Sequence, residues 1–199
     1  VDYALQVPML FIKRNDRWIK INKKLTFYQY IQKGFKEHRA TIDDWELHLS
    51  SIFTEIRLRK YIEIRNADSQ KKEFALAIPA LWKGILYSKE ARQAVLSLIG
   101  NLPWNELCLL YSRVPRTGLK TKIGKMKLLS IAKEILKISF SGLVEQKKFN
   151  DKKEDESIYL EPIMELVLQD EMCPAEIIIK NWKSKWRGNI QKLIEYTAY

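Results

Sequence analysis

A short charged run in the first third of the chain has the residue types of a phosphate or metal site. Glu63 and Arg65 are separated by Ile64, and this alternation is the period of a β-strand, so both charged side chains are predicted on one strand face. Arg57 lies a few residues earlier in the same run. Such a face can be a salt-bridge ladder on a solvated sheet. It can instead face a cavity, where the carboxylate would bind Mg²⁺ and the guanidinium groups would bind phosphate oxygens.

The elements predicted around this run are short. Apolar and β-branched residues between polar turns predict strands at 4–13, 17–21 and 55–65. Helices are predicted at 26–32 and 41–49, the second opened by a variant capping box in which Asp44 follows Thr41. His48 lies on that second helix, and a hydrogen-bonded core or supporting role is favoured over a catalytic one.

The pattern becomes helical from about residue 71. Helices are predicted at 73–87 with an interruption at Pro79, and then at 89–99, 104–112, 125–140, 159–168, 175–186 and 189–196. Strands followed by helices predict an α+β protein, divided into residues 1–70 with the strands and residues 71–199 with the helices.

The composition is that of a globular protein. With 46% hydrophobic and 11% aromatic residues, the chain of 199 residues can bury a sizeable core. The net charge of +11 is spread over many short basic runs with acids between them, so a nucleic-acid partner is not expected. No apolar run approaches the roughly 20 residues that a membrane helix needs, so no membrane association is expected.

The two cysteines and the first residue bear on location. Cys108 and Cys173 have no metal-binding spacing, which favours buried thiols in a reducing cytoplasm. The chain starts at Val1 and opens into an apolar run without a charged leader, which we interpret as an internal cut or processed end rather than a signal peptide.

Several blocks carry a resemblance to a known family. The run Tyr-Ile-Glu-Ile-Arg-x-x-Asp at 61–68 resembles the Glu-x-Arg strand of the glutamine-synthetase-like carboxylate–amine ligases. Ordered blocks along almost the whole chain are similar to the plant-type glutamate–cysteine ligases, namely those at 1–10, 41–58, 79–87, 114–120 and 173–176. The resemblance implies that residues 1–70 form part of a catalytic antiparallel sheet and that residues 71–199 form the helical C-terminal region.

The resemblance also implies a reaction and roles for individual residues. ATP would phosphorylate the γ-carboxylate of glutamate, and the amine of cysteine would then attack, giving γ-glutamylcysteine in the first step of glutathione biosynthesis. Glu63 would take a metal position for Mg²⁺. Arg65 would contact the transferred phosphate, and Arg57 would contact nucleotide phosphate or the charged reaction centre. Tyr3 would line the pocket of an amino-acid substrate.

The family is longer than this sequence. Its N-terminal part, which should hold further metal-binding glutamates and a substrate-binding arginine, would be the partner of this segment, and the segment alone is expected to be inactive. Two alternatives are a γ-glutamyl ligase that uses another amine and a non-catalytic helical interaction module. An in-frame acidic half upstream would favour a ligase, whereas an initiator directly before Val1 would favour the module.

Overall fold

The computed structural model describes residues 1–21, 24–58 and 60–198. The chain forms two compact units, Val1–Ala67 and Asp68–Tyr199, and each is described by itself.

The first unit combines three short helices with two hairpins. Its elements along the chain are α1 Asp2–Gln6, β1 Phe11–Arg14, β2 Arg17–Lys20, α2 Phe27–Lys33, α3 Ile42–Ser51, β3 Ile56–Leu58 and β4 Ile62–Ile64. Its core cluster consists of the buried side chains of Met9, Ile12, Ile21, Phe27 and Tyr30. These side chains come from the segment before β1, from β1, from the residue after β2 and from α2, so this small core holds the first hairpin against that helix.

Two helices of this unit begin at capping boxes. The Thr26 hydroxyl oxygen accepts a hydrogen bond from the backbone N–H of Gln29, whose side-chain oxygen in turn accepts one from the Thr26 N–H. Thr41 and Asp44 do the same for α3. The capping box predicted for the second helix is therefore confirmed, because its signal depends on residues three apart and on nothing distant.

The predicted strands at 4–13 and 55–65 are partly wrong. Residues 4–6 belong to α1, and a strand begins only at Phe11. Between them Pro8 forms a single bridge with Thr26, as expected of a residue without an N–H to donate. The second run is a hairpin of two three-residue strands, because the chain reverses between Leu58 and Ile62. Arg59, which was included in that prediction, lies outside the described residues.

The second unit is mainly helical. Its helices are α4 Lys72–Ala75, α5 Ala77–Leu86, α6 Lys89–Ile99, α7 Trp104–Thr117, α8 Leu128–Gln146, α9 Glu161–Met164, α10 Pro174–Lys183 and α11 Ile190–Thr197. The 3₁₀ turns η1 Gly118–Lys120 and η2 Glu156–Leu160, the π turn η3 Glu165–Gln169, and the strands β5 Lys122–Ile123 and β6 Met126–Lys127 complete it. The break in the first predicted helix falls at Leu76, so Pro79 lies in the first turn of α5, where a missing N–H is tolerated.

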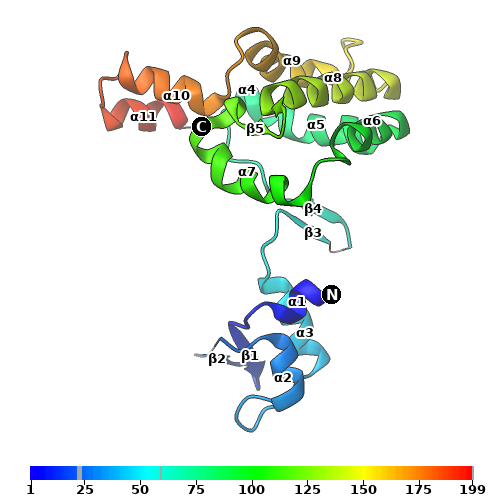
Figure 1. Ribbon diagram of the computed structural model, residues 1–199, viewed down its shortest axis with the longest axis vertical. Coiled ribbons are helices and arrows are strands. Elements are labelled where there is room, and N and C mark those ends of the chain that lie inside the picture. Colours follow the sequence, from blue (N-terminus) through cyan, green and yellow to red (C-terminus); the bar gives the residue numbers. More distant parts are fainter. Residues whose placement is uncertain (22–23, 59, 199) are drawn as a thin grey trace. The chain divides into compact units, whose positions relative to one another are not determined.

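Helices α5 and α8 lie side by side at the centre of the second unit (Figure 1). A Cβ atom added to Gly142 would lie 2.1 Å from the carbonyl oxygen of Gly84, and one added to Gly84 would lie 2.2 Å from the carbonyl oxygen of Ser139. The two backbones therefore approach as closely as they do because both positions lack a side chain. Ala77, Ala80, Leu143 and Leu160 form the buried cluster beside this contact.

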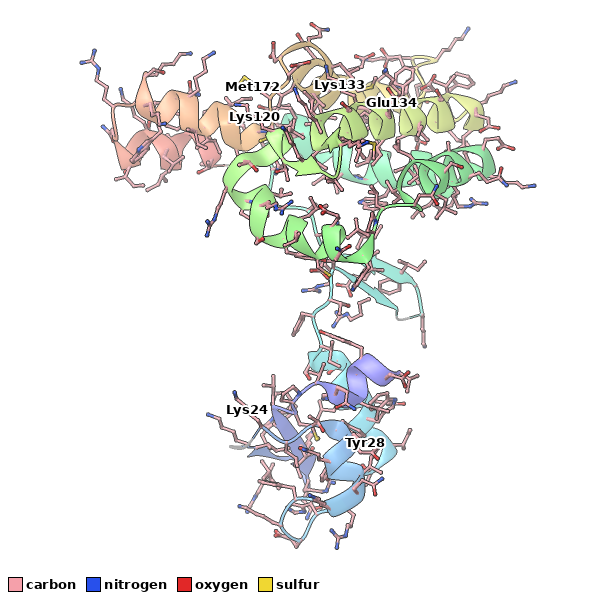
Figure 2. The ribbon with its side chains drawn as sticks, viewed as in Figure 1. Lys24, Tyr28, Lys120, Lys133, Glu134 and Met172 are labelled. Atoms are coloured by element: carbon pink, nitrogen blue, oxygen red, sulfur yellow. The ribbon has the colours of Figure 1, made fainter. Side chains whose placement is uncertain are left out.

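The α+β class predicted from the sequence is confirmed, but the strands of the described residues do not join into one sheet. They form three separate antiparallel pairs, β1–β2, β3–β4 and β5–β6. No helix within residues 1–21, 24–58 and 60–198 is long and apolar enough to cross a membrane. Lysines are spread over both units: Lys24 precedes α2, Lys120 ends η1 and Lys133 lies on α8 (Figure 2).

Candidate functional site

The β3–β4 hairpin brings the predicted charged residues together. Its register pairs Ile56 with Ile64 and Arg57 with Glu63 across the two strands. Because neighbouring residues on a strand point to opposite faces, the charged pair lies on one face and the isoleucines lie on the other. Arg65 follows β4 directly, and its backbone N–H donates to the carbonyl oxygen of Glu55 at 2.7 Å, which extends the pairing by one residue.

Arg57 is the most buried member of this face. Its Nε and Nη2 atoms lie 2.9 and 2.7 Å from Oε2 of Glu63. Its Nη1 donates to the carbonyl oxygen of Ser50, near the end of α3, at 3.1 Å. Only 12% of its side chain is exposed. The guanidinium group is thus held at two ends, by a carboxylate across the hairpin and by the backbone of a helix.

Arg65 holds the other oxygen of the same carboxylate. Its Nη1 lies 2.7 Å from Oε1 of Glu63. Both guanidinium groups also lie over the ring of Phe53, at 5.3 Å for Arg57 and 4.8 Å for Arg65. An aromatic face attracts such cations and fixes their planes. We refer to Phe53, Arg57, Glu63 and Arg65 as the arginine cluster.

The electrostatics of the arginine cluster favour an ionised carboxylate. The hydrogen bond from Arg57 lowers the pKa of Glu63 below its ordinary value; desolvation opposes this effect, and the bond from Arg65 adds to it. Two guanidinium groups against one carboxylate leave the cluster with a net positive charge. A cluster of this kind can bind an anion, and a planar guanidinium matches the oxygens of a phosphate.

The structure brings three of the four predicted site residues together and not the fourth. Glu63 and Arg65 share one face, as the alternation at 62–65 predicted, and the cross-strand pairing of Arg57 with Glu63 puts Arg57 on the same face. Tyr3 lies on α1, with 66% of its surface exposed. Within the described ranges, no hydrogen bond or ring contact joins it to the arginine cluster.

Sequence reasoning missed Phe53 of the arginine cluster and the backbone carbonyl of Ser50 that contacts it. Phe53 precedes the hairpin and was not singled out, although an aromatic residue four positions before Arg57 is a usable signal for a cation–π contact. The carbonyl of Ser50 carries no side-chain signal, because any residue at that position would supply it.

Comparison with known proteins decides the family. The model of glutamate–cysteine ligase family 2 matches residues 1–196. The chain belongs to glutamate–cysteine ligase family 2. The chloroplastic glutamate–cysteine ligases of Solanum lycopersicum and Arabidopsis thaliana are 32% and 33% identical to it over its whole length. The chloroplastic glutamate–cysteine ligase A of Oryza sativa subsp. indica is 32% identical over the same span.

The chain spans only part of these ligases. It covers 37% of the tomato and Arabidopsis proteins and 39% of the rice protein. The comparisons also correct one expectation. A cytoplasmic location was inferred from unpaired cysteines alone, and it is contradicted by the chloroplastic enzymes that this family member matches.

A magnesium ion needs several oxygen ligands, and the arginine cluster contains one carboxylate. Glu63 has the hard oxygen ligands that Mg²⁺ prefers. In the described part of the chain, no group of three or more His, Cys, Asp or Glu residues could hold a metal ion. The described residues of the arginine cluster therefore offer a magnesium ion one carboxylate, that of Glu63.

Proposed function

We propose that this chain is the C-terminal part of an ATP-dependent glutamate–cysteine ligase, which joins the γ-carboxylate of glutamate to the amine of cysteine. The observation that carries the proposal is the family match over residues 1–196 together with the arginine cluster that the same residues build. In this reaction the γ-phosphoryl group of ATP passes to glutamate, giving an acyl phosphate and ADP. Attack by the cysteine amine then releases phosphate.

The chemical need in such a reaction is the management of negative charge. A polyanionic nucleotide must approach a carboxylate, so cationic groups must neutralise both partners and the charge that develops during transfer. Arg65 is the more exposed arginine of the cluster, and we assign it to the transferred phosphate. Arg57, which is held by Glu63 and Ser50, would supply a fixed positive charge for the nucleotide or the reaction centre.

Glu63 would contribute one ligand to a magnesium ion bound with the nucleotide. When bound, the metal ion would neutralise phosphate charge and polarise the phosphoryl group. The arginines beside Glu63 keep its carboxylate ionised, which is the state that a metal ligand needs. The remaining ligands would come from the phosphates and from the part of the enzyme outside this chain.

We also propose that the β3–β4 hairpin continues a larger, glutamine-synthetase-like antiparallel sheet whose other strands lie outside this segment. Ile56 and Ile62, on the face opposite the arginine cluster, are 56% and 60% exposed. An apolar sheet face normally packs against another layer. The remainder of the enzyme would cover this face and close a substrate pocket over the charged one, with Tyr3 at the amino-acid substrate.

The first test uses the intact enzyme that contains this segment. Glu63→Gln and Arg65→Ala should each lower kcat by about 10²- to 10³-fold, the size expected on removing a preorganised electrostatic contact. Arg17→Ala, which removes an exposed arginine of β2, should leave turnover unchanged. ADP release is the measurement, and full turnover in Glu63→Gln would reject its metal role.

The choice of amine is tested by the same assay. ADP release with glutamate should be much faster with cysteine than with alanine or other amines; a preference for another amine would make the protein a different γ-glutamyl ligase.

Titration calorimetry of the segment alone with Mg²⁺ and ATP should show little heat, because the segment supplies too few metal ligands. Tight binding of Mg²⁺ and ATP by the segment alone would contradict the proposal that the other metal ligands come from the rest of the enzyme.

A further inference from the structure

His48 is buried in the first unit, and its ring makes one hydrogen bond within the part of the chain that the structure describes. It is 3% exposed, and its Nε2 lies 2.8 Å from the carbonyl oxygen of Ala4 in α1. A carbonyl oxygen can only accept, so Nε2 donates this hydrogen bond. In the described ranges of the chain, Nδ1 is buried without a hydrogen-bond partner. The hydrogen bond of the ring is thus made to the backbone of α1, at the residue after Tyr3.

The aromatic residues around His48 fix the direction of this bond. The ring of Phe27 is stacked on the imidazole at a centroid distance of 5.0 Å and an interplanar angle of 24°. The ring of Trp45 also contacts the imidazole, at a centroid distance of 6.0 Å. A ring packed in this way has little freedom to rotate, so the donor stays aimed at α1.

Helix α1 needs such an anchor. It has five residues, and its N-cap makes no side-chain hydrogen bond. A single helical turn is unstable by itself, so tertiary contacts must hold it. Ala4 is buried and Leu5 packs against the core, but Tyr3 on the same turn is 66% exposed. The bond from His48 to Ala4 therefore lies next to the position predicted for the substrate pocket.

The helix that carries His48 also braces the arginine cluster. The carbonyl oxygen of Ser50 accepts the hydrogen bond from Nη1 of Arg57, and the Ser51 hydroxyl donates to the carbonyl oxygen of His48 at 2.7 Å. Helix α3, drawn beside α1 in Figure 1, thus contacts both the turn that bears Tyr3 and the arginine that faces Glu63.

We propose that His48 is a positioning residue of the ligase: it holds α1, and with it Tyr3, at a fixed place relative to the arginine cluster through the common helix α3. This inference rests on the proposed function for its link to substrate. His48 does not act as an acid or base in it, because both ring nitrogens are buried. Its effect on the reaction passes through Tyr3 and the amino-acid substrate, not through the nucleotide.

The test is a double-mutant cycle in the intact enzyme. His48→Leu removes the donor and puts an apolar side chain in its place. It should raise KM for one amino-acid substrate by about tenfold, the equivalent of one hydrogen bond, with KM for ATP unchanged. His48→Gln, whose amide can donate, should recover part of the loss. Glu46→Gln, an exposed change on the same helix, serves as the control.

The decisive comparison is made in a Tyr3→Ala background. If His48 acts through Tyr3, His48→Leu will add nothing to the KM already raised by Tyr3→Ala. An equal effect of His48→Leu in both backgrounds would overturn the inference, and so would a Tyr3→Ala enzyme with the parent KM.

A second measurement does not depend on activity. Hydrogen exchange should become faster at the amides of Leu5 and Val7, which close the turn of α1, in His48→Leu but not in Glu46→Gln. Unchanged exchange would disprove the anchor even if the enzyme is a ligase. Faster exchange in a protein that releases no ADP with glutamate and cysteine would support the anchor and reject the proposed function separately.

Discussion

The first unit and the second unit are each stabilised internally by a different kind of contact. In the first unit, a buried carboxylate joins three elements: Arg14 of β1 contacts Asp44 of α3 through two bonds of 2.6 and 2.7 Å, and the hydroxyl of Tyr30 in α2 lies 3.1 Å from the same carboxylate. Asp44 is 2% exposed. Directional contacts of this kind specify one arrangement of elements that are each too short to be stable alone.

In the second unit, the central contact is one of shape. Helices α5 and α8 meet where Gly84, Gly142 and Ser139 leave room for backbone against backbone. The 19 residues of α8 and the mainly apolar residues of α5 present enough apolar surface to be fixed largely by packing, and the Ser139 hydroxyl adds a hydrogen bond to the carbonyl oxygen of Leu81 at 2.9 Å. The difference teaches that the site-bearing unit relies on polar anchors such as Asp44 and His48, and that its geometry is sensitive to single polar substitutions.

The largest effect is expected from breaking the polar anchor. Asp44→Ala leaves Arg14 without its carboxylate partner and removes the acceptor of the Thr41 N–H in the α3 capping box, so the free energy of unfolding should fall by about 3 kcal/mol. Urea unfolding monitored by tryptophan fluorescence measures it. Asp43→Asn, a change at the exposed neighbouring position in the same helical turn, should cost well under half as much. Equal losses in the two variants would contradict the anchor role of Asp44.

A smaller effect is expected from disturbing the shape contact. In Gly142→Ala the new methyl group meets the carbonyl oxygen of Gly84, and α5 must move away from α8 at a cost of about 1–3 kcal/mol. Ser141→Ala, at the exposed neighbouring position on α8, should be neutral or slightly stabilising. Thermal unfolding followed by circular dichroism compares the two; a neutral Gly142→Ala would show that the helices are not locked at this crossing.

The sequence predicted those features of the fold whose signals are local. Spacings within a few residues predicted the capping box of Thr41 and Asp44, the strand at 17–21 and the helices after residue 71. It did not predict α1, because an apolar turn before Pro8 has the composition of a strand. It also missed β5–β6, a pair of two-residue strands that is too short to show alternation.

The candidate site was predictable to a similar extent. The alternation at 62–65 placed Glu63 and Arg65 on one face correctly, even though the single strand predicted around them is a hairpin. The roles assigned to these residues and to Tyr3 came from family resemblance and stay predictions. The bond between His48 and Ala4 joins residues 44 positions apart, and no local pattern can reveal a contact that depends on the tertiary fold.

The smallest effect is a pH dependence that should belong to the first unit. Burial raises the pKa of Asp44, but the hydrogen bonds from Arg14, Thr41 and Tyr30 outweigh it and bring the pKa below its ordinary value. Below about pH 4 the unfolded chain therefore binds more protons than the folded chain, and acid lowers the stability. At the alkaline end, burial and the nearby carboxylate raise the pKa of Tyr30 from 10.0 to about 12, so the unfolded chain loses its proton first and stability falls again above pH 10.

Urea midpoints measured from pH 3 to 11 should decline at both ends in the parent protein, and Asp44→Asn should flatten the acid limb while Tyr30→Phe flattens the alkaline one. Because Arg14 is partly exposed, salt should weaken the acid limb, and Gly142→Ala, which lies in the second unit, should change the slope of neither limb.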